Sequence, residues 1–356
     1  VRDSKEAELI MDAEIEVLNQ ETEKNEIISV NLTILPLINE DSDGRTDEKE
    51  SFLGILIMIE DISSEKRMKS TMSRYMDPGI ADQLLEDGAD IMGGLDTTAT
   101  LLFSDLRSFT NITESLGAQG TVKLLNEYFE IMVECISEQG GMLDKFIGDA
   151  IMAAFGLPIS HEDDEDRGVK AGINMIKRLW DWNDLREKDG KPPLDMGLGL
   201  NTDKIVAGNI GSQKRMDYTM IGDGVNLAAR LESACKQYNA RILISDFTFK
   251  KLKGTYRIRY IDDVVVKGKT EPVGVHEVLD YHSEKTFPNL MDVVNHFNEG
   301  RKKYISGDFQ QAITSFKECL KINSEDKLSE TYIDRCTQLI SQKPKNWDGV
   351  WVMKSK

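Results

Sequence analysis

The stretch "LLFSDLRSFT", residues 101–110, places an acidic side chain at the end of an apolar run. The first three residues suit a buried strand, yet Asp105 follows them shortly before a turn that contains Ser and Thr. A carboxylate in this position serves either as the cap of the following helix or as a metal ligand. Ser104 or Ser108 would cap a helix without a full charge, so this segment favours a metal ligand and leaves the cap open.

A second acidic residue in apolar surroundings occurs in "LDKFIGDAIMAAFG", residues 143–156. Gly148 and Asp149 join two apolar runs, a pattern typical of a hairpin. Turns favour Asp, so a turn role is the simpler interpretation of Asp149 by itself. Neighbouring central strands would nevertheless bring Asp105 and Asp149 to one sheet edge, where buried carboxylates repel unless a cation lies between them. Hard oxygen ligands suit Mg²⁺ or Mn²⁺, and two such ions are the usual clamp for phosphate chemistry.

The composition excludes several function classes. The 356 residues allow two or three domains, and the net charge of −18 argues against nucleic acid or an anionic membrane surface as the main partner. Four widely spaced cysteines indicate reduced thiols in a cytosolic protein, and four histidines without HExxH-type spacing argue against zinc. No apolar run reaches the roughly 20 residues that span a bilayer. We expect a cytoplasmic catalytic region, cut from a longer protein because Val1 lies within charged sequence. Membrane attachment of that longer protein stays open.

The distribution of apolar runs predicts the order of elements. Two β-rich runs, residues 26–38 and 50–62, predict an antiparallel hairpin that lacks the rest of its sheet. The helix expected after Ser63 is either a connector that pairs with its copy in a dimer or a surface linker. Residues 95–280 alternate strands, hairpins and helices, which indicates an α+β fold rather than a purely parallel α/β sheet. Residues 288–340 are again helical.

Within residues 95–280 the predicted elements have clear limits. The expected helices are residues 121–139, 165–187 and 223–238. The expected strands are residues 98–106, the two runs of the 143–156 hairpin, two strands within 194–211, and finally 241–245 and 258–268, which finish the sheet.

Three segments in this order resemble the signature segments of the class III nucleotide cyclase catalytic domain: "LLFSDLRSFTNITE", "LDKFIGDAIMAAFG" and "DYTMIGDGVNLAARLE". The resemblance covers about residues 97–280 and implies a ferredoxin-like, palm-like βαββαβ core with a mixed sheet, followed by a C-terminal helical pair. The N-terminal hairpin resembles the closing strands of a PAS-type sensor domain. Residues 293–326 resemble one tetratricopeptide-type helix pair, which would dock on the preceding domain or on a partner. The whole is similar to bacterial, particularly cyanobacterial-type, adenylate cyclases.

These resemblances imply five segments along the chain. They are the C-terminal part of a PAS-like sensor domain (1–62), a helical connector (63–94), the cyclase catalytic domain (95–280), a tetratricopeptide-like helical segment (288–345) and a tail (346–356).

The family resemblance also implies roles for the phosphate side of the site. Asp105 and Asp149 match the two metal-binding acids, and the backbone carbonyl of Leu106 would be a further ligand. The N–H groups of the turn that includes Phe109 and Thr110 would hold the triphosphate, as helix N-termini attract phosphate.

Lysine residues near the end of the domain match positions that contact phosphate. Lys267 matches the lysine on the terminal phosphates, with Lys269 as the alternative because the KGK spacing blurs the alignment. Lys214 or Arg215 are further candidates for a phosphate contact.

The base and the transition state involve a second set of residues. Lys145 matches the lysine that reads adenine N1, and Thr219 matches its partner position. Many adenylate cyclases carry Asp there and others Thr, whereas guanylate cyclases carry Glu and Cys at this pair, so the resemblance implies ATP. Asn226 would orient the ribose oxygen and Arg230 would stabilise charge on the α-phosphate. For an isolated arginine, a surface salt bridge would be the simpler interpretation.

The resemblance therefore implies an adenylate cyclase that converts ATP to 3′,5′-cyclic AMP and pyrophosphate by attack of the ribose 3′-hydroxyl, with two Mg²⁺ or Mn²⁺ per site. In this fold the acids and the Lys/Thr/Asn/Arg set come from opposite protomers, so a homodimer forms two sites.

The alternatives are a guanylate cyclase or a non-catalytic nucleotide-binding regulator. A diguanylate cyclase would need a GGDEF-type turn, whereas this chain has "FIGDA". A protein partner for the C-terminal helices and a response to bicarbonate are left open, as is the signal that the N-terminal region senses.

Overall fold

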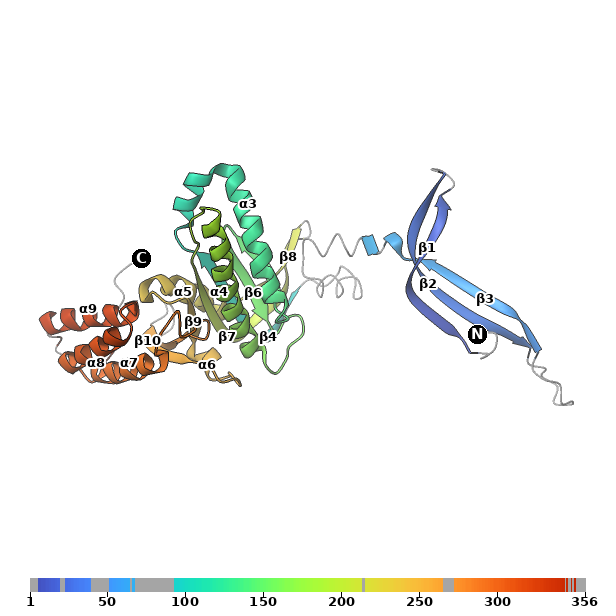
Figure 1. Ribbon diagram of the computed structural model, residues 1–356. Coiled ribbons are helices and arrows are strands. Elements are labelled where there is room, and N and C mark those ends of the chain that lie inside the picture. Colours follow the sequence, from blue (N-terminus) through green and yellow to red (C-terminus); the bar gives the residue numbers. More distant parts are fainter. Residues whose placement is uncertain are drawn as a thin grey trace, which may run out of the picture. The chain divides into compact units, whose positions relative to one another are not determined.

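The computed structural model describes residues 6–19, 23–39, 51–64, 66–67, 93–212, 215–264 and 272–342, together with 344, 347 and 349. Two compact units make up the chain, Val1–Ala89 and Asp90–Lys356 (Figure 1). Most of the predicted connector lies outside the described residues. None of the helices in the described part combines the length and apolar character that crossing a bilayer requires.

The first unit contains an antiparallel sheet with the strand order β1-β2-β3 (Figure 1). The predicted hairpin is confirmed, because β2 (Lys24–Asn39) pairs antiparallel with β3 (Ser51–Asp61). The sequence did not predict β1 (Glu8–Asn19), whose acidic residues interrupt the apolar pattern. Leu56 and Ile57 are both exposed although neighbouring strand residues face opposite sides, so both faces of β3 keep apolar surface in this unit. The PAS-like assignment stays a prediction.

The second unit is built on an eight-stranded sheet with the order β10-β11-β9-β7-β4-β6-β5, and β8 pairs with β7 off this path. All pairs are antiparallel except β7 with β9, so the mixed sheet that the sequence predicted is confirmed. The strands are β4 (Gly93–Leu106), β5 (Met142–Ile147), β6 (Ala150–Phe155), β7 (Met196–Ser212), β8 (Arg215–Ile221), β9 (Ile242–Ser245), β10 (Ile258–Val264) and β11 (Val273–Val278).

Two details of the predicted sheet were wrong. The two strands predicted within residues 194–211 are one continuous strand, β7, because its first half pairs with β4 and β9 while its second half pairs with β4 and β8. The sequence analysis also ended the sheet at β10, whereas β11 lies between β10 and β9. The strand β11 was not predicted because the polar residues His276 and Glu277 interrupt its apolar pattern, although both are buried.

Helices cover the sheet and form two apolar cores. Figure 1 shows α3 beside α4, and their apolar residues pack with those of β4, β6 and β7 in one core. The second core joins α5 and β9–β11 to the C-terminal helices. The helices are α3 (Phe109–Ser137), α4 (Asp164–Lys188), α5 (Asp223–Tyr238), α6 (Asp246–Phe249), α7 (Leu290–Ile305), α8 (Phe309–Ile322) and α9 (Lys327–Gln342).

The C-terminal segment contains three helices, one more than the predicted pair. The α7–α8 pair packs closely because Gly300 has no side chain: a Cβ there would lie 2.7 Å from the Phe316 ring. Phe297 and Phe316 belong to the same core as Val275 of β11. The helices therefore dock on the sheet of the second unit, which was one of the two expected arrangements. The tetratricopeptide-like assignment stays a prediction.

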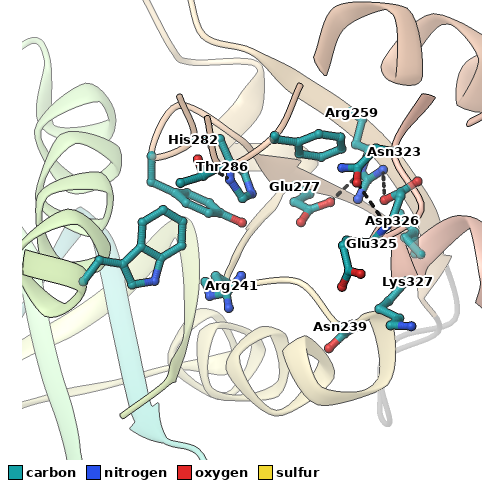
Figure 2. Close-up of a pocket in the computed structure, with 14 residues that line it drawn as sticks. Asn239, Arg241, Arg259, Glu277, His282, Thr286, Asn323, Glu325, Asp326 and Lys327 are labelled. Atoms are coloured by element: carbon teal, nitrogen blue, oxygen red, sulfur yellow. Dashed lines mark hydrogen bonds and ion pairs between the residues drawn. The ribbon is translucent and has the colours of Figure 1, made fainter. Parts of the chain in front are cut away.

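A cavity of about 480 Å³ lies where the loop before α9 meets β10 and β11 (Figure 2). Buried Arg259 of β10 contacts Glu277 at 2.6 Å and Asp326 at 2.8 Å, as the dashed lines of Figure 2 show. One guanidinium group thus contacts two acidic side chains in the cavity wall. The network ties the α8–α9 loop to the sheet, since breaking a buried pair leaves an uncompensated charge.

Candidate active site

Asp105 and Asp149 meet at one edge of the sheet. Asp105 is the last but one residue of β4, and Asp149 follows Gly148 in the turn between β5 and β6. This turn needs glycine, because Gly148 has a positive φ of 66°. Since β4 and β6 are neighbours, the two carboxyl groups lie close enough for the Asp105 side chain to act on Asp149. Burial and the Asp105 carboxylate together raise the pKa of Asp149 to about 6.

The donor set of this pair fits a hard divalent cation. Two carboxylates in contact repel each other, and a bound cation would remove that repulsion. The backbone N–H of Leu106 faces Asp149 and counteracts the rise of its pKa, so the Leu106 peptide adjoins the pair. Across the described ranges, no group of three or more His, Cys, Asp or Glu side chains is arranged to hold a metal. The site offers two carboxylates, whose oxygen atoms suit Mg²⁺ or Mn²⁺ better than zinc.

The cap interpretation of Asp105 was wrong. The residue before α3 is Ser108, which has a φ of 57° and makes no side-chain capping bond. Phe109 and Thr110 are the first residues of α3, so their N–H groups lie at the helix N-terminus, where anions are attracted. This places the predicted phosphate-binding turn directly after the Asp105 strand.

Two further charged residues, Glu232 and Lys236 of α5, lie near Asp105. The Lys236 Nζ is 3.6 Å from Asp105 Oδ2. Burial, followed by the Asp105 charge, raises the pKa of Glu232 to about 7. The sequence analysis missed both residues, although their spacing of four places them on one helical face of "RLESACK".

The close approach of α5 to β7 depends on glycine. A Cβ on Gly199 would lie 2.2 Å from the backbone N of Glu232 and 2.4 Å from the carbonyl oxygen of Ala228. Both neighbours are backbone atoms that cannot move independently of the helix. Gly199 therefore fixes the distance between α5 and the strand that pairs with Asp105.

Asn226 and Arg230 are exposed on α5. Leu227 and Leu231 anchor the helix in the core. Their spacing from Glu232 places Asn226 and Arg230 on a different side of the helix from the residue that faces Asp105. Both side chains thus lie on an exposed side of α5 that differs from the side of Glu232.

Lys145 and Thr219 come together through a third residue, Asp144. The Thr219 hydroxyl donates to Asp144 Oδ2 at 3.2 Å, and Lys145 Nζ lies 3.6 Å from the same oxygen. Thr219 is on β8, whereas Asp144 and Lys145 are on β5. The sequence analysis named Lys145 and Thr219 but missed Asp144.

The predicted phosphate-contacting residues near the end of the domain are only partly described. Lys267, Lys269 and Lys214 lie outside the described residues. Arg215 is exposed at the start of β8, with its Nε 3.7 Å from Asp217 Oδ1.

Comparison with known proteins identifies the family. The family model of the adenylate and guanylate cyclase catalytic domain matches residues 95–282, more than half of the 356-residue chain. The chain therefore belongs to the adenylate and guanylate cyclase family. The predicted class III cyclase fold is confirmed.

Two curated relatives and one solved structure illustrate the similarity. The terminal-differentiation-specific adenylate cyclase of Dictyostelium discoideum is 38% identical over 68% of this chain and 11% of its own length. An adenylate cyclase of Anabaena cylindrica is 38% identical over 50% of this chain and 36% of its own length. The crystal structure of the adenylyl cyclase CyaB from P. aeruginosa has a TM-score of 0.50 and 35% identity, covering 55% of this chain and 100% of that one. The chain thus spans a minor part of both curated relatives.

Proposed function

We propose that the catalytic region converts ATP to 3′,5′-cyclic AMP and pyrophosphate, as the names of the adenylate cyclases among its relatives suggest. The observation that carries this proposal is the contact between the Asp105 and Asp149 carboxyl groups. Such a pair is built to hold divalent cations beside a phosphate-binding helix terminus.

Class III cyclase domains generally use divalent metal ions. Asp105, Asp149 and the carbonyl of Leu106 would hold them here, and we assign two Mg²⁺ or Mn²⁺ to each site. When bound, these ions lower the pKa of the ribose 3′-hydroxyl and neutralise charge on the phosphates. The N–H groups of Phe109 and Thr110 orient the triphosphate at the N-terminus of α3.

Asn226 and Arg230 act on the transition state from a second copy of the chain. Asn226 orients the ribose, and Arg230 stabilises negative charge that grows on the α-phosphate. Their exposure on α5, on a different side from Glu232, supports a site completed by a homodimer. Lys267 is proposed to contact the terminal phosphates.

Lys145 and Thr219 read the adenine. A lysine has three donors and no acceptor, so Lys145 donates to adenine N1. Their shared contact with Asp144 supports the assignment, because it brings the two side chains to one place. ATP is therefore proposed as the substrate and GTP as the alternative.

Catalysis in this proposal takes place in the cytoplasm. All four cysteines are free and buried, in agreement with the predicted reduced thiols. The signal sensed by the region before the catalytic unit and any partner of the C-terminal helices lie beyond this proposal.

The direct experiment incubates the purified chain with ATP or GTP and Mg²⁺ or Mn²⁺, and follows cyclic nucleotide and pyrophosphate. The proposal expects cyclic AMP and equimolar pyrophosphate. Cyclic GMP as the main product would favour the guanylate cyclase alternative. ATP binding without pyrophosphate would establish a non-catalytic regulator.

A further inference from the structure

Asp144 is a buried carboxylate placed between the two residues that we assign to the base. Its side chain is 0% exposed, whereas that of Lys145 is 40% exposed. One oxygen, Oδ2, accepts the hydrogen bond of Thr219 and lies near the Lys145 ammonium group. The other, Oδ1, is buried without a hydrogen-bond partner in the described part of the chain.

A β-bulge gives Asp144 this position. Leu143 pairs with Ala153 and Lys145 pairs with Met152, so Asp144 is an extra residue without a partner in β6. A bulge redirects side chains locally and is common beside active sites. Here it points the carboxylate toward Thr219 on β8, a strand that is not a neighbour of β5 in the sheet.

The Asp144 carboxyl group accepts a hydrogen bond from the Thr219 hydroxyl, and this contact sets how the hydroxyl is oriented. Burial raises the pKa of Asp144, while the Lys145 charge and the Thr219 hydrogen bond counteract that rise. A carboxylate only accepts hydrogen bonds, and a hydroxyl has one proton and two lone pairs. Once Thr219 has donated its proton to Asp144, its oxygen can only accept from any further partner.

This arrangement of donor and acceptor matches adenine and does not match guanine. The 6-position of adenine carries an amino group, which donates, whereas that of guanine carries an oxygen, which accepts. An accepting Thr219 oxygen beside a donating Lys145 therefore complements adenine. Guanine would place two acceptors against each other and leave a buried polar group unpaired.

We propose that Asp144 is a specificity-determining positioning residue, which fixes the Thr219 hydroxyl as an acceptor and so selects a 6-amino purine nucleotide over a 6-oxo one. The inference rests on the proposed function of the same site. Asp144 itself does not touch the nucleotide but acts through Thr219 and Lys145.

The test measures kcat and KM for ATP and GTP in Asp144→Asn and Asp144→Leu. Both substitutions remove the charge, and leucine also removes every acceptor. We expect Asp144→Leu to lower the ATP/GTP ratio of kcat/KM by roughly tenfold or more, mainly through a higher KM for ATP, because a base contact of this kind contributes about 1–3 kcal/mol. Asp144→Asn, which keeps one acceptor oxygen for Thr219, should lower the ratio less. The melting temperature should stay equal or rise, since a desolvated charge is removed.

A matched control separates this effect from general electrostatics. Asp217 lies on the same strand as Thr219, and its negative charge also acts on Asp144, but its side chain is 56% exposed. Asp217→Asn removes the same charge and should leave the ATP/GTP ratio unchanged. An equal fall in Asp217→Asn, or an unchanged ratio in Asp144→Leu, would overturn the proposal. A lower melting temperature with an unchanged ratio would show that Asp144 is merely structural.

A double-mutant cycle tests whether Asp144 acts through Thr219. Thr219→Val should lower the ratio, Thr219→Ser should preserve it, and Asp144→Leu should add little in the Thr219→Val background. If the effects of the two substitutions on the ratio were additive, Asp144 would not act through Thr219. Dissociation constants for 3′-deoxy-ATP and 3′-deoxy-GTP, which cannot cyclise, report base selection without turnover. A chain that prefers 3′-deoxy-ATP through Asp144 but forms no cyclic AMP would refute only the proposed function.

Discussion

The Asp105 and Asp149 carboxyl groups contact each other, although one ends a strand and the other belongs to a hairpin turn. The antiparallel pairing of β4 with β6 brings the backbones of these two residues to the same edge of the sheet. Burial first, and the Asp105 carboxylate second, raise the pKa of Asp149 to about 6, so the folded chain contains a local repulsion. A cation held between the two carboxylates would remove this repulsion.

Asp149→Asn separates metal binding from folding. We expect the variant to melt at the same or a higher temperature than the wild type without metal, because one repelling charge is gone. Mn²⁺ should stabilise the wild type, by about 2.7 kcal/mol at a hundredfold excess over Kd, and the variant much less. Thermal denaturation with and without Mn²⁺ measures both effects. Equal stabilisation of the two proteins would contradict the metal assignment.

Mixing two inactive variants tests the shared site. Asp149→Ala and Arg230→Ala should each abolish cyclic AMP formation, while an equimolar mixture regains about a quarter of the wild-type activity. Half of the dimers are then mixed, and each carries one intact site. The control is a mixture of the Asp149→Ala chain with a chain that carries both Asp149→Ala and Arg230→Ala. This mixture should stay inactive. No recovery in confirmed mixed dimers would show that each site belongs to one chain.

Gly199→Ala should destabilise the catalytic unit by about 3 kcal/mol, at the upper end of ordinary overpacking, because the new Cβ would overlap backbone atoms of α5. Gly172→Ala is the matched control: its Cβ would lie 3.6 Å from Leu198, an ordinary contact, within helix α4. This control should gain up to about 1 kcal/mol from helix propensity. Urea denaturation of both variants measures the difference, and equal stabilities would contradict the close α5–β7 contact.

His282, labelled in Figure 2, should make the catalytic unit acid-sensitive. Burial, then the charges of Arg241, Arg259 and Arg257, lower the pKa of His282 to about 3. The unfolded chain binds a proton near its ordinary pKa of about 6.5, so stability is lost progressively as the pH falls from there toward 3. His282→Gln should flatten the dependence of the unfolding free energy on pH over this range, whereas His296→Gln should not. An unchanged slope in His282→Gln would refute the assignment.

Local patterns predicted much of the fold. The helix expected at residues 223–238 is α5, Asp223–Tyr238, because its apolar period is regular and Gly222 precedes it. The 143–156 hairpin is also confirmed. The prediction failed where contacts with distant segments determine the structure. The strand β7 continues through the middle of residues 194–211. The strand β11 contains buried His276 and Glu277, whose hydrogen-bond partners come from other parts of the fold.

The sequence by itself determined which residues are candidates for the chemistry, since the acids, the Lys/Thr pair and the Asn/Arg pair stand in recognisable segments. Only the tertiary structure decided what surrounds them. Asp144 reaches Thr219 through a bulge in β5, and Lys236 reaches Asp105 where α5 passes over glycine in β7. The physical reason is that residue type and spacing are local properties. Contacts between distant strands and helices depend on register and on how closely backbones approach.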